Sequence, residues 1–199
     1  MRFLTTVGAI IFLCSLTGSA ASARVFDANS APQGWAIKGD KPTKYEFALE
    51  VSADDKKTVV DIKSKASEIE GFTTLMQKIS ADKYDNQRLE FTGWLKTSNI
   101  KVLGGLWMRI DTENGRVLSF DNMEKRPIIG TTDWKKYGIV LDVPKDAHAI
   151  SFGILIHGTG EICARDLSLK TVSKDVPVTS GSEQESLQSE PVNLDFSAK

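Results

Sequence analysis

The chain has few of the residues from which catalytic and metal centres are most often built. It contains two cysteines and two histidines among 199 residues. His148 and His157 lie at the two ends of one predicted strand, ~30 Å apart at ~3.3 Å per residue, so they cannot share a metal ion. The sequence also has no His-Glu-x-x-His, no Gly-x-Ser-x-Gly and no phosphate-binding glycine loop. We therefore predict no catalytic residues, no required cofactor and a chain that is not an enzyme.

A surplus of basic residues is also missing. The chain has 25 Lys and Arg against 26 Asp and Glu, which gives a formal net charge of −1. Binding to nucleic acid usually needs a basic face, and binding to an anionic membrane surface needs a polybasic segment. The charge balance therefore predicts no nucleic-acid partner.

Long apolar runs are absent, because no run reaches the ~20 residues that span a bilayer. The run Val7–Leu16 comes nearest, and it has the surroundings of a secretory signal. Arg2 precedes it, and Ala21-Ser22-Ala23 follows it with the small residues that signal peptidase needs. We predict a removable signal peptide over residues 1–23, export to the periplasm or the medium, and no membrane span after cleavage.

Cleavage would leave Cys163 as the one cysteine of the exported chain. Such a cysteine can be a reactive thiol or a link between two subunits. A small buried side chain is the simpler interpretation. The fold would then depend on its hydrophobic core, which is feasible because a domain of ~150 residues buries ~70% of its unfolded surface.

Residues 35–172 show apolar and polar residues in alternation, which predicts half-buried β-strands. Turn residues such as Asn114-Gly115 separate the strands, and the one helical stretch, around 80–86, is short. This pattern predicts an all-β fold, an antiparallel β-sandwich of the jelly-roll type with about nine strands. The predicted strands are Tyr45–Val51, Val59–Ser64, Phe72–Ile79, Arg88–Lys96, Gly105–Asp111, Val117–Phe120, Tyr137–Val143, Ala149–His157 and Ile162–Val172.

The composition changes after these strands. From Val178 to Pro191 the chain is mostly Ser, Gly, Gln and Glu. Such a segment cannot bury enough apolar surface to offset the entropy lost on ordering. We predict a β-sandwich domain over residues 24–172 and a flexible polar tail over residues 173–199.

Several segments of the domain carry a resemblance to a known family. They are Phe26-Asp27 with Gln33-Gly34-Trp35, then Gly71–Gln77, Gly105–Asp111, Ser119–Met123, Gly130–Tyr137 and Arg165–Leu169. Together they resemble bacterial exported and accessory modules with the galactose-binding-like jelly-roll fold, which many carbohydrate-binding modules share. The resemblance spans Val25–Val172. It implies the jelly-roll sandwich and a carbohydrate-binding role.

Some modules of this family hold a structural calcium between their first and last strands. The resemblance makes Asp27 and Asp166 the candidate ligands here. The closing strand of such modules often carries a Trp and two adjacent Asp, whereas this chain has Cys163 and Arg165 at the Trp and first Asp positions. Calcium takes six to eight oxygen ligands, so the missing carboxylate weakens the expected site.

A row of aromatic and polar side chains is the strongest candidate for a ligand site. In the predicted strand Gly105–Asp111, Trp107 and Arg109 share one face while Leu106 and Met108 share the other. The second face is typical of core, so the first faces outward. The candidate ligand-binding residues are Trp107, Arg109, Asp111, Asp121, Asn122, Arg126, Gln77 and His157.

An indole beside planar hydrogen-bonding groups suits a sugar, whose apolar face lies on the ring while its hydroxyls are bound by Arg, Asp and Asn. The leading hypothesis is an exported, non-catalytic module that binds a carbohydrate. In the alternative interpretation Trp107 is buried and Arg109 forms a structural ion pair with Asp111 or Asp121. Trp94 also points away from the predicted core, either exposed or beneath a loop. Two other functions stay open: an envelope-associated module that binds a protein partner, and a hydrolase that uses carboxylates such as Asp121.

Overall fold

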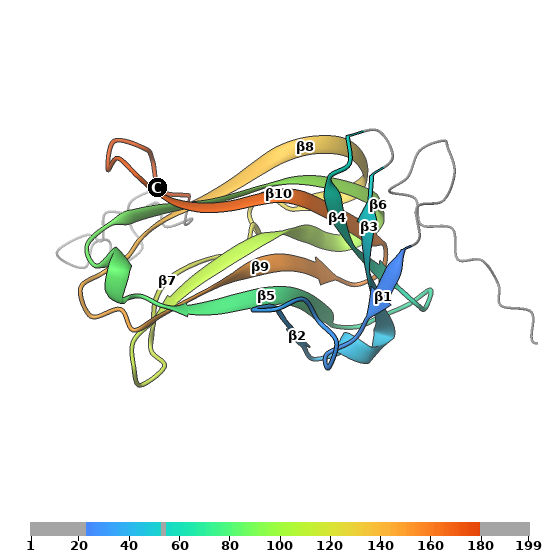
Figure 1. The fold of residues 1–199 in the computed structure, drawn as a ribbon, viewed down its shortest axis with the longest axis horizontal. Coiled ribbons are helices and arrows are strands. Elements are labelled where there is room, and N and C mark those ends of the chain that lie inside the picture. The colour runs from blue at the N-terminus through green and yellow to red at the C-terminus, as the bar shows by residue number, and fades with distance from the viewer. Residues whose placement is uncertain (1–22, 53–54, 180–199) are drawn as a thin grey trace, which may run out of the picture.

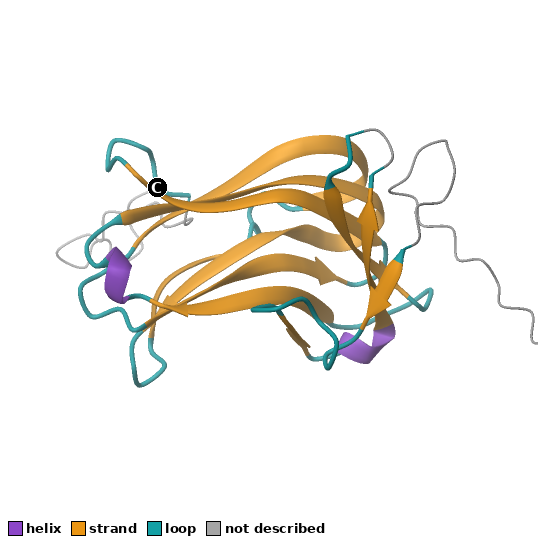
Figure 2. Ribbon diagram, in the orientation of Figure 1, coloured by secondary structure: helices purple, strands orange, loops and turns teal. Residues whose placement is uncertain are grey.

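The computed structural model of the chain describes residues 23–52 and 55–179. Within these residues the fold is an antiparallel β-sandwich with two single-turn 3-10 helices and no α-helix, which confirms the predicted class (Figure 2). The elements are β1 (Arg24–Phe26), β2 (Ala36–Gly39), η1 (Pro42–Lys44), β3 (Tyr45–Val51), β4 (Thr58–Ser64), β5 (Phe72–Ser80), η2 (Asp82–Tyr84), β6 (Arg88–Asp111), β7 (Val117–Asp121), β8 (Ile128–Asp142), β9 (Ala149–His157) and β10 (Glu161–Val172).

The strands form two layers that share β6 (Figure 1). Residues 88–98 of β6 pair with β10, and residues 103–111 pair with β9. The β10 layer contains β1, β3, β4, β10, the first part of β6 and β8. The β9 layer contains β2, β5, β9, the second part of β6 and β7. One long strand therefore carries the chain from one layer to the other.

Strand β6 corrects the expectation of two separate strands at Arg88–Lys96 and Gly105–Asp111. The segment between them contains no glycine or proline until Gly104, and it stays hydrogen-bonded to β8 as it changes layer. Three register shifts between Leu95 and Gly104, with a left-handed Asn99 at φ 53°, absorb the bend. Bulges of this kind increase the local twist and redirect a strand without ending it.

The core lies between the layers and follows the alternation of β6. Leu89 and Phe91 in the first part of β6 are buried, as are Leu106 and Met108 in the second part. Phe91 also packs on Phe152 of β9, with ring centroids 5.0 Å apart. Each such side chain contributes roughly 1.5–3 kcal/mol when it leaves water. The residues between them in the sequence must face outward, which sets the position of Trp107.

Two details of the strands differ from the predictions. Strands β1 and β2 are short and were not predicted, and β8 begins at Ile128 rather than Tyr137. The helical stretch around 80–86 is one 3-10 turn, Asp82–Tyr84. The Cys163 side chain is 3% exposed and therefore buried. Among the described residues, no helix is both long and apolar enough to cross a membrane.

The segment that follows β10 contacts the sandwich. Arg88 donates from Nη1 to the backbone oxygens of Lys174 and Val176, while its Nε and Nη2 bind the Asp142 carboxylate at 2.8 Å. Thr179 then hydrogen-bonds to the backbone of Val140 on β8. The predicted tail thus begins with residues 173–179 held against the domain, and residues 180–199 lie outside the described residues.

Candidate functional site

The outer face of the β9 layer consists of the side chains that alternate with the core residues. Pairing between strands aligns these side chains in rows across the layer. Successive rows are ~7 Å apart, because a strand rises ~3.3 Å per residue and every second residue faces outward. Read from β6 across β9 to β5, the rows are Arg109 with Ser151 and Lys78, Trp107 with Gly153 and Met76, Gly105 with Leu155 and Thr74, and Leu103 with His157 and Phe72; Lys38 of β2 extends the third row.

A groove of about 690 Å³ lies on this face. The bend of β6, the segment between β7 and β8, and the β2–β5 edge border it. Three large apolar side chains that are exposed to solvent line it, Phe72, Val102 and Phe120. The other lining residues are Lys38, Gly39, Thr74, Met76, Leu103, Trp107, Arg109, Asn122, Glu124, Pro127, Ser151, Leu155 and His157. Its volume falls in the ~300–1,000 Å³ range of small-molecule sites, and its lining is mainly apolar with a few polar groups, as such sites are.

Trp107 is half-buried, and its indole is fixed by a hydrogen bond. Its Nε1 donates to Thr74 Oγ1 at 2.6 Å, and Thr74 Oγ1 donates in turn to the Ile154 carbonyl oxygen at 2.6 Å. Both polar hydrogens are thus satisfied within the protein, and the indole keeps one orientation. The aromatic platform is therefore formed before any ligand arrives.

Gly153 lies beside Trp107 in the same row, and the close approach of β5 to β9 requires it. A Cβ at this position would lie 2.2 Å from the Leu75 backbone oxygen. A side chain here would separate the two strands and disturb the row that holds the indole.

Arg109 forms the ion pair of the alternative interpretation and also lines the groove. Its Nε lies 3.0 Å from the Asp111 carboxylate, which is buried. The Arg109 side chain is 45% exposed to solvent. The ion pair fixes the guanidinium at its Nε edge and leaves the Nη edge for a ligand. Asp111 therefore holds Arg109 from the neighbouring row of β6 without lining the groove itself, whereas the sequence analysis placed both residues in the site.

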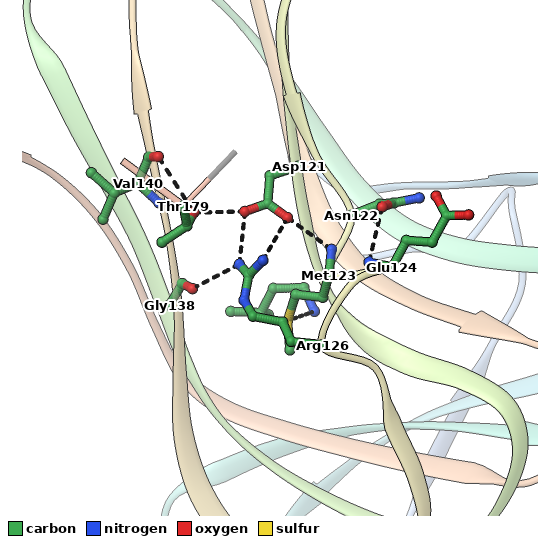
Figure 3. Close-up of polar contacts among 9 residues, drawn as sticks. Asp121, Asn122, Met123, Glu124, Arg126, Gly138, Val140 and Thr179 are labelled. Carbon is green, nitrogen blue, oxygen red and sulfur yellow. Dashed lines mark hydrogen bonds and ion pairs between the residues drawn. The ribbon is translucent and has the colours of Figure 1, made fainter. Parts of the chain in front are cut away.

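Asp121 and Arg126 lie outside the groove, contrary to the prediction. Asp121 pairs in register with Met108, a core residue, so its carboxylate points away from the face that carries Trp107. Arg126 donates to it from both Nη nitrogens, at 3.0 and 2.7 Å, and Thr179 Oγ1 donates to it at 2.6 Å (Figure 3). The buried carboxylate is satisfied by these contacts, and they attach residue 179 to the end of β7.

Two further predicted residues reach the groove and one does not. Asn122 and His157 line it, and Figure 3 shows Asn122 and Glu124 on the opposite side of Asp121 from Thr179. Gln77 pairs with Phe152, a core residue, so it belongs to the opposite face of the layer. The structure therefore unites Trp107, Arg109, Asn122 and His157 of the predicted residues.

Several groove residues were missed by the sequence reasoning. Phe120 pairs with Arg109 and is 45% exposed, and Phe72 pairs with His157. An exposed aromatic side chain at an outward position of each strand was the available signal. Lys38 comes from β2, which was not predicted, and no local pattern connects it with β6.

The calcium expected from the family resemblance does not fit Asp27 and Asp166. Asp27 Oδ1 accepts hydrogen bonds from the backbone nitrogens of Asn29 and Ser30, both at 3.0 Å, and closes its own turn. Asp166 Oδ2 lies 2.5 Å from the Lys57 ammonium. A calcium ion would have to displace that ammonium and open the turn closed by Asp27 before it could gather its six to eight oxygen ligands.

A second group of acidic residues is buried in the β10 layer. Asp61 is fully buried and Glu161 is nearly so, and their ligand atoms and that of Cys163 lie within 4.8 Å of one another, the one such triple in residues 23–52 and 55–179. Burial, followed by the neighbouring Glu161, raises the pKa of Asp61 well above its ordinary value. Lys63 Nζ lies 3.2 Å from the Glu161 carboxylate. The raised pKa of Asp61 and the Lys63 ammonium both reduce the negative charge of this cluster.

Comparison with known proteins gives a relative in sequence and several in fold. No family model matches the chain. Over 166 residues the chain is 37% identical to an uncharacterized HTH-type transcriptional regulator of Bacillus subtilis (strain 168), YbfP. The match covers 82% of this chain and 56% of the regulator. The chain thus spans little more than half the length of that relative.

Among solved structures, the enzymatically active domain of tailspike protein 4 from bacteriophage CBA120 superimposes with a TM-score of 0.52 at 13% identity, over 70% of this chain and 20% of that one. An arabinose-bound GH51 α-L-arabinofuranosidase gives 0.50 at 14% identity, over 70% and 23%. A xylan-binding domain of Paenibacillus barcinonensis Xyn10C gives 0.47 at 12% identity, over 79% and 99%. At these identities the first two likenesses show the β-sandwich fold alone.

Proposed function

We propose that the chain is a non-catalytic binding module whose ligand, a carbohydrate, lies in the groove on the outer face of the β9 layer. The observation that carries the proposal is the fixed indole of Trp107 beside the free edge of the Arg109 guanidinium and the Asn122 amide. A sugar ring has an apolar face that stacks on an aromatic side chain. Its hydroxyls accept hydrogen bonds from, and donate them to, planar polar groups such as guanidinium and amide. The exposed ring of Phe120 adds a second apolar contact.

The proposal of a non-catalytic role follows from the state of the acidic groups. Asp121 is held by Arg126 and Thr179, and Asp111 is held by Arg109. Neither carboxylate is placed as a free acid or base beside the indole. A hydrolase would instead release product from model glycosides, and that product would disappear in Asp121→Asn.

The experiment that tests the proposal is a glycan array probed with the full chain, followed by titration of the best ligand. Trp107→Ala is expected to weaken that ligand at least tenfold. Trp94→Ala is the matched control, since Trp94 is 38% exposed and belongs to the first part of β6, on the β10 layer. Circular dichroism of both variants verifies the fold. Silence across the array, or equal losses in both variants, would contradict the proposal.

The similarity to a transcriptional regulator favours a second candidate, a ligand sensor. The similar region spans 82% of this chain, and the described residues contain no α-helix from which a helix-turn-helix could be built. The shared part is therefore the sandwich, and in this candidate the groove binds an effector. A sensor and an accessory module differ in the partner, not in the groove. Ligand binding by the matching part of the regulator would support the sensor.

Export of the chain is proposed from its first residues. The basic start at Arg2, the apolar run Val7–Leu16 and the small residues before Arg24 form a secretory signal. Residues 1–22 lie outside the described residues. An envelope protein as partner stays a prediction.

A further inference from the structure

The charged side chains on the groove face are mostly cationic. Lys38 and Arg109 line the groove, and Glu124 is the one carboxylate among its lining residues. Lys78 follows Phe72, Thr74 and Met76 in the outward alternation of β5 and pairs with Ser151, so it borders the same face. Asp111 balances Arg109, but it is buried one row further along β6 and does not line the groove. A ligand in the groove therefore meets the positive edge of this ion pair first.

The Arg109 guanidinium has a defined orientation toward a ligand. Because Nε is held 3.0 Å from the Asp111 carboxylate, the two Nη groups form a fork on the groove side. Such a fork matches the two oxygens of a planar carboxylate, and the bonds are stronger than those to a neutral hydroxyl. Arg109 and Trp107 occupy adjacent rows ~7 Å apart, so a group attached to a ring on the indole reaches the fork.

We infer that the ligand is an acidic sugar, in which a ring carrying a carboxylate, as in a uronic acid, stacks on Trp107 and places its carboxylate on the Nη edge of Arg109. This inference rests on the proposed function, because it names the class of carbohydrate for the same groove. Lys38 and Lys78 add a favourable potential across the face, and Glu124 opposes it. Since these three groups are exposed, their effect is screened by salt.

The test uses the full chain and pairs of oligosaccharides that differ in charge. Oligogalacturonate, oligomannuronate and an oligosaccharide containing glucuronate are titrated by calorimetry, each against its neutral homologue. We expect at least one acidic member to bind tenfold or more tightly than its neutral homologue. We also expect its Kd to rise as NaCl is increased from 20 to 300 mM, whereas the Kd of a neutral sugar should not change.

Substitutions of two exposed charges should then give effects of opposite sign. Lys38→Gln should weaken the acidic ligand about threefold to tenfold, and Glu124→Gln should strengthen it, with no change for a neutral ligand. Lys136→Gln is the control, because Lys136 is exposed on β8 of the other layer. None of these variants removes a buried partner, so loss of folding does not confuse the result.

The outcomes separate the inference from the proposed function. Neutral oligosaccharides that bind as tightly as their acidic homologues overturn the inference and leave the carbohydrate proposal standing. Preference for a sulfated neutral backbone over every uronate overturns the carboxylate assignment. If no oligosaccharide of either charge binds, both are wrong.

Discussion

Trp107 and Asp121 lie on paired strands, yet they belong to opposite faces. The alternation of β6 correctly places Trp107 and Arg109 outward, because it depends only on neighbours in the sequence. The direction of Asp121 depends on its register with Met108, and a bulge at Ile110 and Asp111 sets that register. Local alternation contains no information about such a bulge, so the predicted row mixed residues from two faces.

At the same scale, Asp61 predicts how stability depends on pH. Its pKa is raised from 3.8 to about 9 by burial and by Glu161, while Lys63 acts in the opposite direction. The folded state therefore favours the protonated form. This contribution is complete below pH ~4 and is lost as the pH rises toward 9. We expect Asp61→Asn, which resembles the protonated acid, to remove this loss.

The measurement is the free energy of unfolding in urea at pH 5 and pH 8. We compare the free energy of unfolding of Asp61→Asn with that of the wild type at each pH. We expect this difference to favour the variant by at least ~1 kcal/mol more at pH 8 than at pH 5, since one unit of pKa shift corresponds to 1.36 kcal/mol. Glu50, whose pKa is also raised by burial, faces the same cluster, and Glu50→Gln gives a second comparison. An identical pH dependence in wild type and Asp61→Asn would show that Asp61 is not the group responsible.

At the scale of elements, the ends of β7 and β8 are attached to the segment after β10. Thr179 Oγ1 donates to Asp121 at 2.6 Å and accepts from the Val140 backbone nitrogen at 2.8 Å. Thr179→Val keeps the shape and removes both bonds. We expect it to lower the free energy of unfolding by about 1 kcal/mol, whereas Thr179→Ser should retain most of the stability. Urea titration of the two variants distinguishes them, and equal stability of Thr179→Val and wild type would contradict this role.

The elements also show where sequence reasoning succeeds. Strands β3 and β9 begin and end where their alternation predicts, although outward positions such as Glu50 and Ser151 are also buried. Strand β6 crosses from one layer to the other, so each of its faces has different neighbours before and after the bend. Its alternation pattern therefore predicts two separate strands. The groove depends on the nonlocal pairing of β2 with β5, which brings Lys38 to the same face as Trp107. No single segment encodes that arrangement.

At the scale of the whole molecule, export is a separate prediction. Expressed in a bacterial host from Met1, the chain should be recovered outside the cytoplasm with Arg24 as its first residue. Replacing the small residues of the cleavage motif, with Ala21→Lys and Ala23→Lys together, should block processing. N-terminal sequencing and intact mass measure both. Recovery of the unprocessed wild-type chain from the cytoplasm alone would contradict the prediction.

A crystal structure of the full chain with the tightest oligosaccharide from the array would show whether the carbohydrate lies in the groove of the β9 layer. We predict a sugar ring stacked on Trp107, with polar contacts to Arg109 and Asn122. A ligand bound on any other surface, or one that leaves Trp107 uncovered, would contradict the claim.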